Sequence, residues 1–228
     1  VESAMSDSQV SQAVDYGRMV GRNLASMTDC LIIGESIPGG TTTALAVLRG
    51  LGFKAKVSSS IPNNPIELKN QIVNSALGRL TSDNPYHIIA TVGDPMIAFV
   101  AGMLSSASEI TKVMLAGGTQ MAAVLAFASK IGFNEKNVAI GTTSYISNDN
   151  SANFKSLVSE IADIPAISVN PGLENSKFSG LKAFSQGFAK EGVGAGGSII
   201  ASMIKTGNDS THFLTLSEKE YHRLFTSL

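Results

Sequence analysis

This chain is organised around the residues Gly34-Glu35-Ser36-Ile37-Pro38-Gly39-Gly40-Thr41-Thr42-Thr43-Ala44. They follow a short apolar run, residues 30–33, of the kind that forms a buried strand. They lead into a second apolar run, residues 44–48, which fits the body of a helix closed by Gly50 and Gly52. The sequence therefore predicts a strand, a glycine-rich turn and a helix in succession.

A turn of this kind suits an anion. Its free backbone N–H groups and the positive end of the helix dipole converge on one point, where a phosphate typically binds. Gly39 and Gly40 let the backbone approach the ligand, and Thr41 and Thr42 add hydroxyl donors. A phosphate repels a carboxylate, so we expect Glu35 to hold a ribose hydroxyl or a nearby donor.

An ordinary strand-to-helix turn, with glycines for tight packing, fits this segment equally well. The segment is not a P-loop, because no lysine follows the glycines, and its spacing is not that of the dinucleotide fingerprint G-x-G-x-x-G. The two interpretations stay open on this segment alone.

Composition limits the class of protein. The 228 residues are 43% hydrophobic and 15% charged, which is enough for a well-buried core and argues against long disorder. A net charge of -1 without a basic block argues against nucleic acid as the main partner. No apolar run approaches the roughly 18 residues of a membrane span, and no signal peptide is visible. We therefore expect a cytoplasmic protein with a single α/β domain over residues 1–228.

The chain offers little to a metal ion. Its one cysteine, Cys30, lies in an apolar run, and His87, His212 and His222 are scattered without ligand spacing. We expect neither a metal site nor a disulfide.

Strands and helices alternate along the rest of the chain. Further strands are predicted at residues 112–116, 137–140 and 165–169, and helices at residues 7–27, 65–79, 95–106, 121–130, 153–161, 181–184, 198–204 and 217–228. Residues 86–92 fit either a strand or a helix, and the preceding Asn84-Pro85 favours a short helix. Ser6, Asn64, Asn84 and Asp94 are expected to cap helices, three of them before a proline. Ser217-Glu218-Lys219-Glu220 resembles a capping box.

Two helical segments carry expectations about packing. The helix at residues 65–79 is expected to turn six apolar side chains inward: Ile66, Leu68, Ile72, Val73, Ala76 and Leu77. The helices at residues 95–106 and 121–130 are apolar almost all round, which fits either a dimer interface or burial within one subunit.

This alternation predicts parallel βαβ units, and hence a doubly wound, Rossmann-like α/β fold with a mostly parallel sheet and helices on both faces. Ligands bind such sheets outside the carboxyl ends of the strands. Residues 34–42, 117–119 and 141–143 each follow a predicted strand, so we expect the three turns to meet at one rim. Their convergence favours ligand binding over simple packing.

Three loop carboxylates could move protons: Glu35, Asp94 and Glu191. Glu191 lies between Lys190 and Gly192 at the start of a predicted helix, whose dipole favours the anion. If Glu191 is shielded from water, its pKa is raised, and it could then act as a general base. A solvated glutamate in a first helical turn is the simpler interpretation of the residues alone, as a plain cap is for Asp94.

Four segments now stand together in order: residues 34–44, Val92-Gly93-Asp94-Pro95-Met96, Ala116-Gly117-Gly118-Thr119-Gln120 and Lys190-Glu191-Gly192-Val193-Gly194-Ala195-Gly196-Gly197. This set resembles the nicotinate-nucleotide:dimethylbenzimidazole phosphoribosyltransferase family, in particular its archaeal and cyanobacterial branch. The resemblance spans residues 16–203. Bacterial members have G-x-G-N-T-T in the first loop, where this chain has residues 38–42 as Pro-Gly-Gly-Thr-Thr.

The resemblance implies a homodimer that transfers phosphoribose from nicotinate mononucleotide to a benzimidazole-type base, with no metal or other cofactor. The family's general base corresponds to Glu191, and its base pocket to Asp94 and Met96. Its nucleotide-binding positions correspond to Glu35, Ser36, Gly39, Gly40, Thr41, Thr42, Gly117, Gly118, Thr119, Thr142, Gly192 and Gly194. Family members are longer at the N-terminus, so this chain is expected to lack a region that helps to form the base pocket.

The implied chemistry agrees with the residues. Nicotinate leaves from a pyridinium and needs no acid, whereas the incoming azole must lose its N–H proton, so one base suffices. A carboxylate such as Glu35 could stabilise the positive ribose in the transition state. Two other hypotheses are a nucleotide-binding relative without turnover and a phosphotransfer enzyme, and the missing P-loop lysine weighs against the second.

Overall fold

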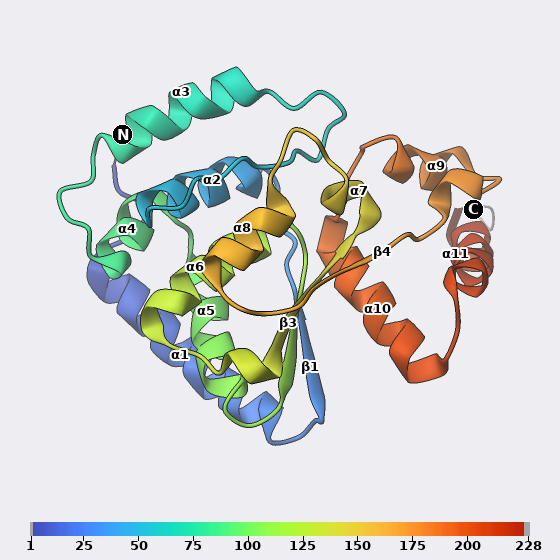
Figure 1. Ribbon diagram of the computed structural model, residues 1–228, viewed down its shortest axis with the longest axis horizontal. Helices are drawn as coiled ribbons and strands as arrows, with labels where there is room; N and C mark the ends of the chain where they lie inside the picture. The colour runs from blue at the N-terminus through green and yellow to red at the C-terminus, as the bar shows by residue number, and fades with distance from the viewer. Residues whose placement is uncertain (1, 226–228) are drawn as a thin grey trace.

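The computed structural model describes residues 2–225 and is built on a four-stranded parallel sheet with the order β1-β2-β3-β4 (Figure 1). The strands are β1 (Cys30–Gly34), β2 (Lys112–Ala116), β3 (Val138–Thr143) and β4 (Ala166–Val169). In register, Gly34 pairs with Ala116, Ala116 with Gly141, and Thr143 with Val169. The carboxyl ends of the strands therefore meet at one rim, as predicted.

Helices cover both faces of the sheet, which confirms the predicted fold class. One face carries α1 (Asp7–Ala25), α2 (Gly40–Gly50), α3 (Ile66–Leu77), α4 (Pro85–Val92), α5 (Pro95–Ala107), α6 (Thr119–Ile131) and α8 (Phe154–Ile161). The other face carries α10 (Ala195–Thr206). The remaining helices are α7 (Ser144–Ser147), α9 (Ser179–Ser185) and α11 (Ser210–Phe225).

The strands feed two hydrophobic cores because their side chains alternate between the faces. Val113, Leu115 and Ile140 point into the large core beneath α2, α5 and α6. Met114 points to the opposite face and packs with Ile199 of α10. Within residues 2–225, no helix is both long and apolar enough to cross a bilayer.

Glycines bring α1 and α5 into close contact. A Cβ on Gly17 would lie 2.0 Å from the carbonyl oxygen of Phe99, and one on Gly102 would lie 2.2 Å from that of Val14. Both contacts are with backbone, so neither helix could keep this approach with a larger residue.

The structure bears out several predicted helix ends. Ser6 and Gln9 form a capping box on α1. Asn84 accepts a hydrogen bond from the backbone N–H of Tyr86, and Asp94 accepts one from that of Ile97. These short polar side chains satisfy N–H groups that the first helical turn leaves unpaired.

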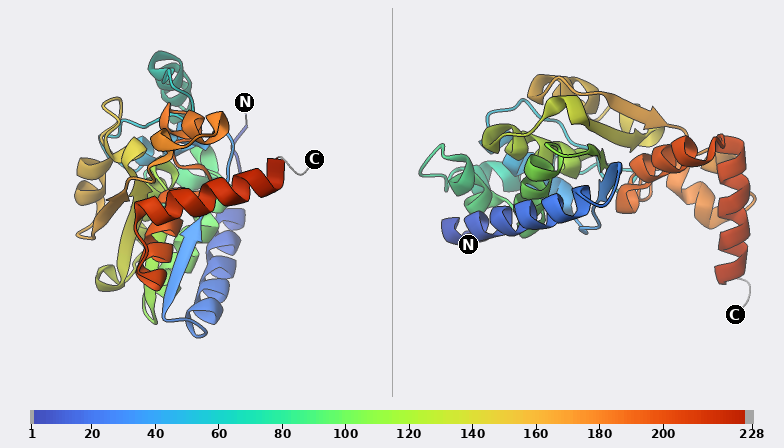
Figure 2. Two further views of the ribbon diagram at one scale, coloured as in Figure 1. Left: turned by 90° about the vertical axis from the view of Figure 1, so that its right-hand side faces the viewer. Right: turned by 90° about the horizontal axis from the view of Figure 1, so that it is seen from below.

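The prediction for α3 was wrong in two respects. Ile66, Leu68 and Ile72, which were predicted to point inward, are exposed, and Lys69 is buried instead. Val73 is buried as predicted, and Ala76 and Leu77 are partly buried against the core. The helix lies at the periphery of the molecule, so only a narrow stripe meets the core (Figure 2).

Asn64 does not cap α3 either. Its side-chain nitrogen donates to the carbonyl oxygen of Val57 and to Ser151, and its oxygen accepts from Lys69. Contacts distant in sequence therefore take the place of the local cap.

Several boundaries differ from the prediction. The helix predicted at residues 198–204 is Ala195–Thr206, the one predicted at residues 181–184 is Ser179–Ser185, and further differences occur in the last helix and in the third strand. The last helix begins at Ser210, so Ser217 lies inside it and no capping box forms there; residues 226–228 of the prediction lie outside the described residues. Glu218 instead accepts hydrogen bonds from Ser176 and the backbone of Lys177. The strand predicted at residues 137–140 extends to Thr143, so residues 141–143 are its end rather than a turn.

Helices α5 and α6 are buried within the chain. Their apolar surfaces are therefore explained by one subunit and give no support to a dimer.

Candidate functional site

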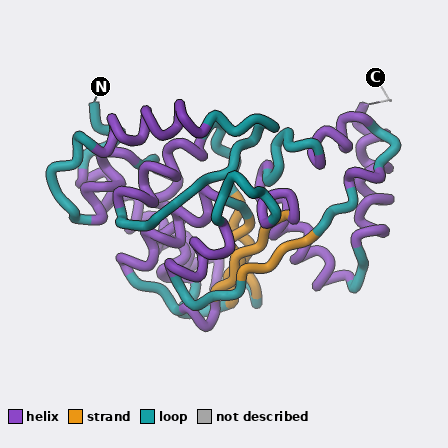
Figure 3. The backbone as a smooth tube through the Cα atoms, turned by 45° about the horizontal axis from the view of Figure 1, so that its top comes forward, coloured by secondary structure: helices purple, strands orange, loops and turns teal. Residues whose placement is uncertain are grey.

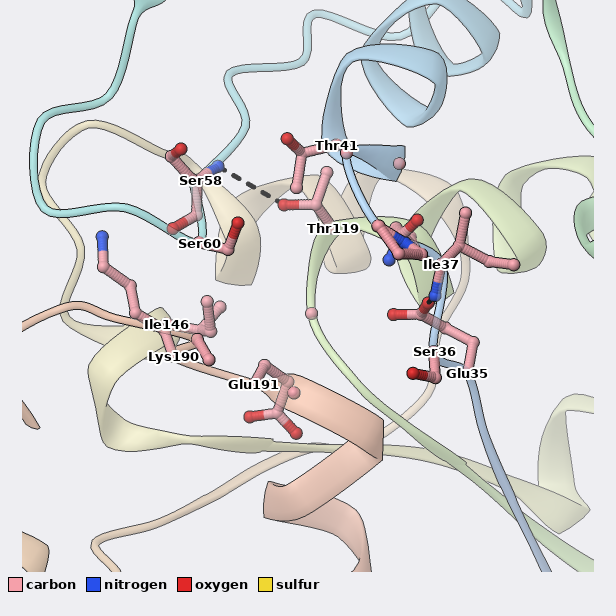
Figure 4. A pocket seen from close by; sticks show the side chains of 18 residues that line it. Glu35, Ser36, Ile37, Thr41, Ser58, Ser60, Thr119, Ile146, Lys190 and Glu191 are labelled. Carbon is pink, nitrogen blue, oxygen red and sulfur yellow. Dashed lines mark hydrogen bonds between the residues drawn. The ribbon is translucent and has the colours of Figure 1, made fainter. Parts of the chain in front are cut away.

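A pocket of about 220 Å³ opens at the rim where the strands end (Figure 4). Five segments line it: residues 35–41, 58–60, 118–120, residue 146 and residues 189–192. The pocket thus combines the first two glycine-rich turns, which were predicted to meet, with the segment that contains Glu191. The third segment of that prediction, residues 141–143, does not line the pocket, and Thr142 and Thr143 instead donate hydrogen bonds to Glu191.

Two helices present uncapped N-termini to this pocket. Gly39 precedes α2 with a φ of 72°, a left-handed conformation that suits glycine, and no side chain caps that helix. Gly118 precedes α6, and again no side chain accepts a hydrogen bond there. The backbone N–H groups and the dipoles of both helices therefore favour an anion at the pocket.

The carboxylate of Glu191 is fixed by the chain itself. Oε1 accepts a hydrogen bond from the backbone N–H of Gly196 at 2.7 Å. Oε2 accepts one from the N–H of Thr143 at 2.7 Å and one from Oγ1 of Thr142 at 3.2 Å. Burial raises the pKa of Glu191, although these hydrogen bonds oppose the shift. The structure therefore contradicts the solvated first-turn interpretation of this residue.

The glycines around Glu191 allow α10 to press against the strand ends. Gly194 has a φ of 71°, and a Cβ there would lie 2.6 Å from the carbonyl oxygen of Ala116. A Cβ on Gly196 would lie 2.0 Å from the carbonyl carbon of Thr142. This close approach brings the N–H of Gly196 within hydrogen-bonding distance of Glu191. The glycines therefore help to fix the position of the carboxylate.

A second carboxylate, Glu35, lies on another wall of the pocket (Figure 4). Its Oε2 accepts a hydrogen bond from the backbone N–H of Ile37 at 2.7 Å. Burial raises the pKa of Glu35, the negative charge of Asp94 adds to the rise, and hydrogen bonds from Ile37 and Gln120 oppose it. Glu35 is therefore partly shielded from water, and the turn that contains it holds its carboxylate in place.

The opposite side of the pocket is rich in hydroxyls and carries an ammonium group. Ser58, Ser60 and Lys190 lie there, away from Glu35 (Figure 4). Lys190 pairs with Asp149, with 2.8 Å between Nζ and Oδ2, and both side chains are nearly buried.

Asp149 connects three loops that shape this wall. It accepts hydrogen bonds from Ser58 Oγ, from the backbone and side chain of Ser151, and from Lys190. Burial alone would raise the pKa of Asp149, but these partners hold it well below its ordinary value. The carboxylate therefore stays ionised and holds the wall together.

Ala189 lines the pocket in a strained conformation. Its φ of 53° is left-handed, which is unfavourable for a residue with a Cβ. Its N–H donates to the carbonyl oxygen of Ser60 at 2.9 Å. This hydrogen bond joins the segment before Glu191 to residues 58–60, the serine loop.

The structure brings most of the predicted site residues together. Those that line the pocket are Glu35, Ser36, Gly39, Gly40, Thr41, Gly118, Thr119, Glu191 and Gly192. Thr142 and Gly194 lie behind Glu191, where they position its carboxylate or its backbone. Thr42, Gly117, Asp94 and Met96 are not among the lining residues. The roles assigned to all of these residues stay predictions.

The sequence prediction missed Ser58, Ser59, Ser60 and Ile146, and it assigned no function to the buried Asp149. The run of three serines before Pro62 was a possible signal, because consecutive hydroxyls in a loop suit phosphate binding. The role of Asp149 had no local signal, since its partners are distant in sequence. Within residues 2–225, no group of His, Cys, Asp and Glu is arranged to hold a metal ion.

Comparison with known sequences relates this chain to phosphoribosyltransferases. A family model described as phosphoribosyltransferase matches residues 1–148. A UPF0284 protein of Archaeoglobus fulgidus is 41% identical over 97% of this chain and 63% of its own length. A UPF0284 protein of Sulfurisphaera tokodaii is 45% identical over 94% of this chain and 62% of its own length. The chain thus spans about three fifths of the length of these relatives.

Comparison with solved structures agrees on the fold. The crystal structure of CobT from Thermus thermophilus matches with a TM-score of 0.60 and 20% identity, over 74% of this chain and 52% of that one. A nicotinate-nucleotide-dimethylbenzimidazole phosphoribosyltransferase structure from the same organism matches with a TM-score of 0.58 and 20% identity, over 74% and 51%. At this identity the likeness establishes a shared fold.

Proposed function

Because this chain belongs to the phosphoribosyltransferase family, we propose that its pocket transfers phosphoribose from nicotinate mononucleotide to a benzimidazole-type base. The product would be an α-ribotide that serves as the lower ligand of a cobalamin. The shared fold with the two Thermus structures and the arrangement of the pocket support the proposal.

The observation that carries the proposal is the carboxylate of Glu191. It is fixed by two backbone N–H groups and one hydroxyl, it borders the pocket, and burial raises its pKa. A carboxylate with a raised pKa accepts a proton more readily than an exposed one. Glu191 is therefore suited to remove the N–H proton of the azole as its nitrogen attacks the anomeric carbon of ribose.

The other groups of the reaction follow from charge. Nicotinate departs with the electrons of the glycosidic bond, which neutralise the pyridinium nitrogen, so no acid is needed. Positive charge develops on the ribose, and Glu35 is the second carboxylate of the pocket that could stabilise it.

We place the phosphate of the mononucleotide beside Ser60 and Lys190, next to the N-termini of α2 and α6, because the hydroxyl of Ser58 already donates to Asp149. A dianion gains from hydroxyl donors, an ammonium group and helix dipoles, and it is repelled by Glu35 and Glu191. The ribose then points toward the two carboxylates. This orientation differs from the first expectation, which used the glycine-rich turn alone.

Three further parts complete the proposal. The base contacts and the homodimer follow the resemblance, whereas the cytoplasmic location and the exclusion of nucleic acid and membrane follow from composition. Asp94 and Met96 contact the incoming base. The negative charge of Asp94 contributes to the raised pKa of Glu35, so the two carboxylates are close enough to influence each other. The protein is a cytoplasmic homodimer. It binds these two small molecules rather than a nucleic acid or a membrane.

The test is a chromatographic assay for nicotinate and a new ribotide, with and without 5,6-dimethylbenzimidazole. We expect nicotinate release that depends on the base. The variant Glu191→Gln should still bind nicotinate mononucleotide, but its turnover should fall by a factor of about 10² to 10⁴, the usual contribution of a general base. Glu160→Gln, on the exposed face of α8, is the matched control and should keep full turnover.

The Gln variant needs a check of its fold. One end of its amide is an NH₂ group, which must face a backbone N–H of either Thr143 or Gly196. The cost is about 1–3 kcal/mol of stability, so the assay is run well below the melting temperature of both proteins. Unchanged turnover would remove Glu191 from the role of base. Saturable binding without any turnover by the unaltered protein would favour a nucleotide-binding relative.

A further inference from the structure

A second cavity, of about 290 Å³, lies between α2, α3 and the loop that follows α2. Helix α2 contributes Leu45 and Arg49 to its lining, the loop after it contributes Lys56 and Val57, and α3 contributes Ile66, Lys69 and Asn70. Asn150 and Ser151 complete it. The cavity shares no lining residue with the substrate pocket.

The charges around this cavity have one sign. Arg49, Lys56 and Lys69 line it, and its lining includes no carboxylate. Among residues 2–225, no ion pair joins any of these three cations to an acidic group. The whole chain has a net charge of only -1, so this concentration of positive charge is local.

Lys69 is the most informative of the three cations because it is only 5% exposed. Its Nζ donates to the carbonyl oxygen of Ser58 at 2.8 Å and to Oδ1 of Asn64 at 2.9 Å, and both acceptors are neutral. Burial, with repulsion from Lys190, lowers the pKa of Lys69 to about 8 in spite of the opposing charge of Asp149. A buried ammonium without a paired carboxylate is costly, and an anion in the cavity would offset that cost.

Asn70 gives an independent sign of an incomplete site. Its Oδ1 is buried and has no hydrogen-bond partner among the described residues. Rotating the side-chain amide by 180° would turn its NH₂ group to the same place, and the two orientations are alike in shape. In that orientation Asn70 becomes a donor on the wall that already carries Lys69.

From these observations we propose that the cavity between α2 and α3 is a second anion site that binds a phosphate-type dianion, either inorganic phosphate or a small phosphomonoester. Arg49 and Lys56 supply charge at its mouth, and Lys69 and Asn70 supply charge and hydrogen bonds within it. The volume accommodates a phosphate group with a small substituent.

This site is linked to the substrate pocket by two routes. One runs through Ser58, and the other runs from Ser151 through Asp149 to Lys190. Ser58 lines the substrate pocket, and its carbonyl oxygen accepts the hydrogen bond from Lys69. An anion that attracts Lys69 therefore acts on the serine loop. Occupancy of the second site should change the KM for nicotinate mononucleotide without competing for its place.

The test measures phosphate binding by calorimetry in phosphate-free buffer of low ionic strength, with saturating nicotinate mononucleotide present. We expect the protein to bind phosphate under these conditions. The double variant Arg49→Gln/Lys56→Ala should bind it at least tenfold more weakly, whereas Lys155→Ala, which removes an exposed ammonium on α8, should bind it within twofold of the unaltered protein. Glycerol 3-phosphate, tested in parallel, distinguishes an ester from the free ion as the better ligand.

Two results would overturn the proposal: unchanged affinity in the double variant, or complete displacement of phosphate by nicotinate mononucleotide. The single variant Lys56→Ala removes an exposed side chain and is safe for the fold, so a loss of affinity of about threefold is expected there even if the double variant fails to fold. Neither Arg49 nor Lys56 lines the substrate pocket. Failure of the proposed transferase reaction would therefore leave the binding result valid.

Discussion

Glu191 reaches its position before any substrate arrives. Two backbone N–H groups and the hydroxyl of Thr142 hold its carboxylate, so little rotational freedom remains to be lost in the reaction. The same contacts stabilise the anion, while burial destabilises it by a larger amount, and the net effect is a raised pKa. A single residue thus combines fixed geometry with increased basicity.

The raised pKa predicts the acid side of the pH–rate profile. The base must be ionised to act, so kcat/KM should fall as the pH drops through the pKa of Glu191. That fall should lie at a higher pH than for an exposed glutamate, because burial favours the protonated form. The measurement is kcat/KM against pH, with kcat/KM expressed per neutral benzimidazole molecule at each pH. A profile that stays flat down to the ordinary glutamate range would contradict the assignment.

Asp149 predicts a different dependence on pH, this time of stability. Its native pKa is lowered, so its contribution to stability is complete above the pKa of the unfolded chain and is lost as the pH falls through the native pKa. Asp149→Asn leaves the nearly buried Lys190 unpaired and should cost about 3–5 kcal/mol at neutral pH.

Urea denaturation at neutral pH and again in the acid range measures this effect of Asp149. The difference between Asp149→Asn and the unaltered protein should shrink as the pH falls below the pKa of this carboxyl in the unfolded chain, because the unfolded state then binds a proton that the native carboxylate does not. Asp163→Asn, at an exposed position before β4, is the control and should lie within about 0.5 kcal/mol of the unaltered protein. An equal loss at both pH values would show that the charge is not the cause.

Among the elements, the α1–α5 pair depends on glycine, as the contact of α10 with the strand ends does. Gly102→Ala would place a Cβ 2.2 Å from the carbonyl oxygen of Val14, so one helix must shift, and we expect a loss of about 2 kcal/mol or more. Gly78→Ala is the matched substitution: its φ is -61° and its Cβ would lie 3.5 Å from the carbonyl oxygen of Ser75, an ordinary contact. Thermal melting should show the first variant lowered and the second close to the unaltered protein.

How far the elements could be predicted depends on how local their causes are. The strand–turn–helix units at Gly34 and Gly117 were predictable, because an apolar run followed by glycines specifies them within a dozen residues. Helix α3 was not, because its sequence offers several apolar side chains and only the tertiary packing selects Val73 over Ile72. For the same reason Lys69 could not be recognised as buried, since Ser58 and Asn64, its partners, lie in the loop before the helix.

At the scale of the molecule, the pocket unites segments that are up to about 150 residues apart in the chain. The glycine-rich motifs could be predicted to meet because parallel strands end at one rim. The wall formed by Ser58, Ser60 and Lys190 could not be predicted from the sequence, because it depends on Asp149, which joins loops from three parts of the chain. The sequence therefore predicted the part of the pocket that contains Glu35 and Glu191 more fully than the wall that contains Lys190.

The molecule also differs in stability from one end to the other. Helix α11 stands away from the sheet, and none of its residues between 210 and 225 is buried (Figures 2 and 3). Phe178 stacks with Tyr221, with 4.9 Å between ring centroids, and Glu218 binds the segment before α9. Such limited packing allows local opening far below the cost of global unfolding.

Hydrogen exchange followed by mass spectrometry tests this contrast. Backbone amides of α11 should exchange orders of magnitude faster than those of α6, whose residues are almost all buried. Strong protection of α11 at low protein concentration would contradict the expectation. Protection that appears only as the concentration rises would instead indicate that a second copy covers this helix.

The ion pair between Lys190 and Asp149 has a consequence for the descent of the family. Replacing one partner alone leaves a nearly buried charge without its counterion and destabilises the protein. Replacing both with neutral side chains of similar volume can leave the free energy of unfolding almost unchanged. Intermediates with a single change should therefore be rare among living sequences. The two positions, 41 residues apart in the chain, should be inherited as a unit, kept together or lost together.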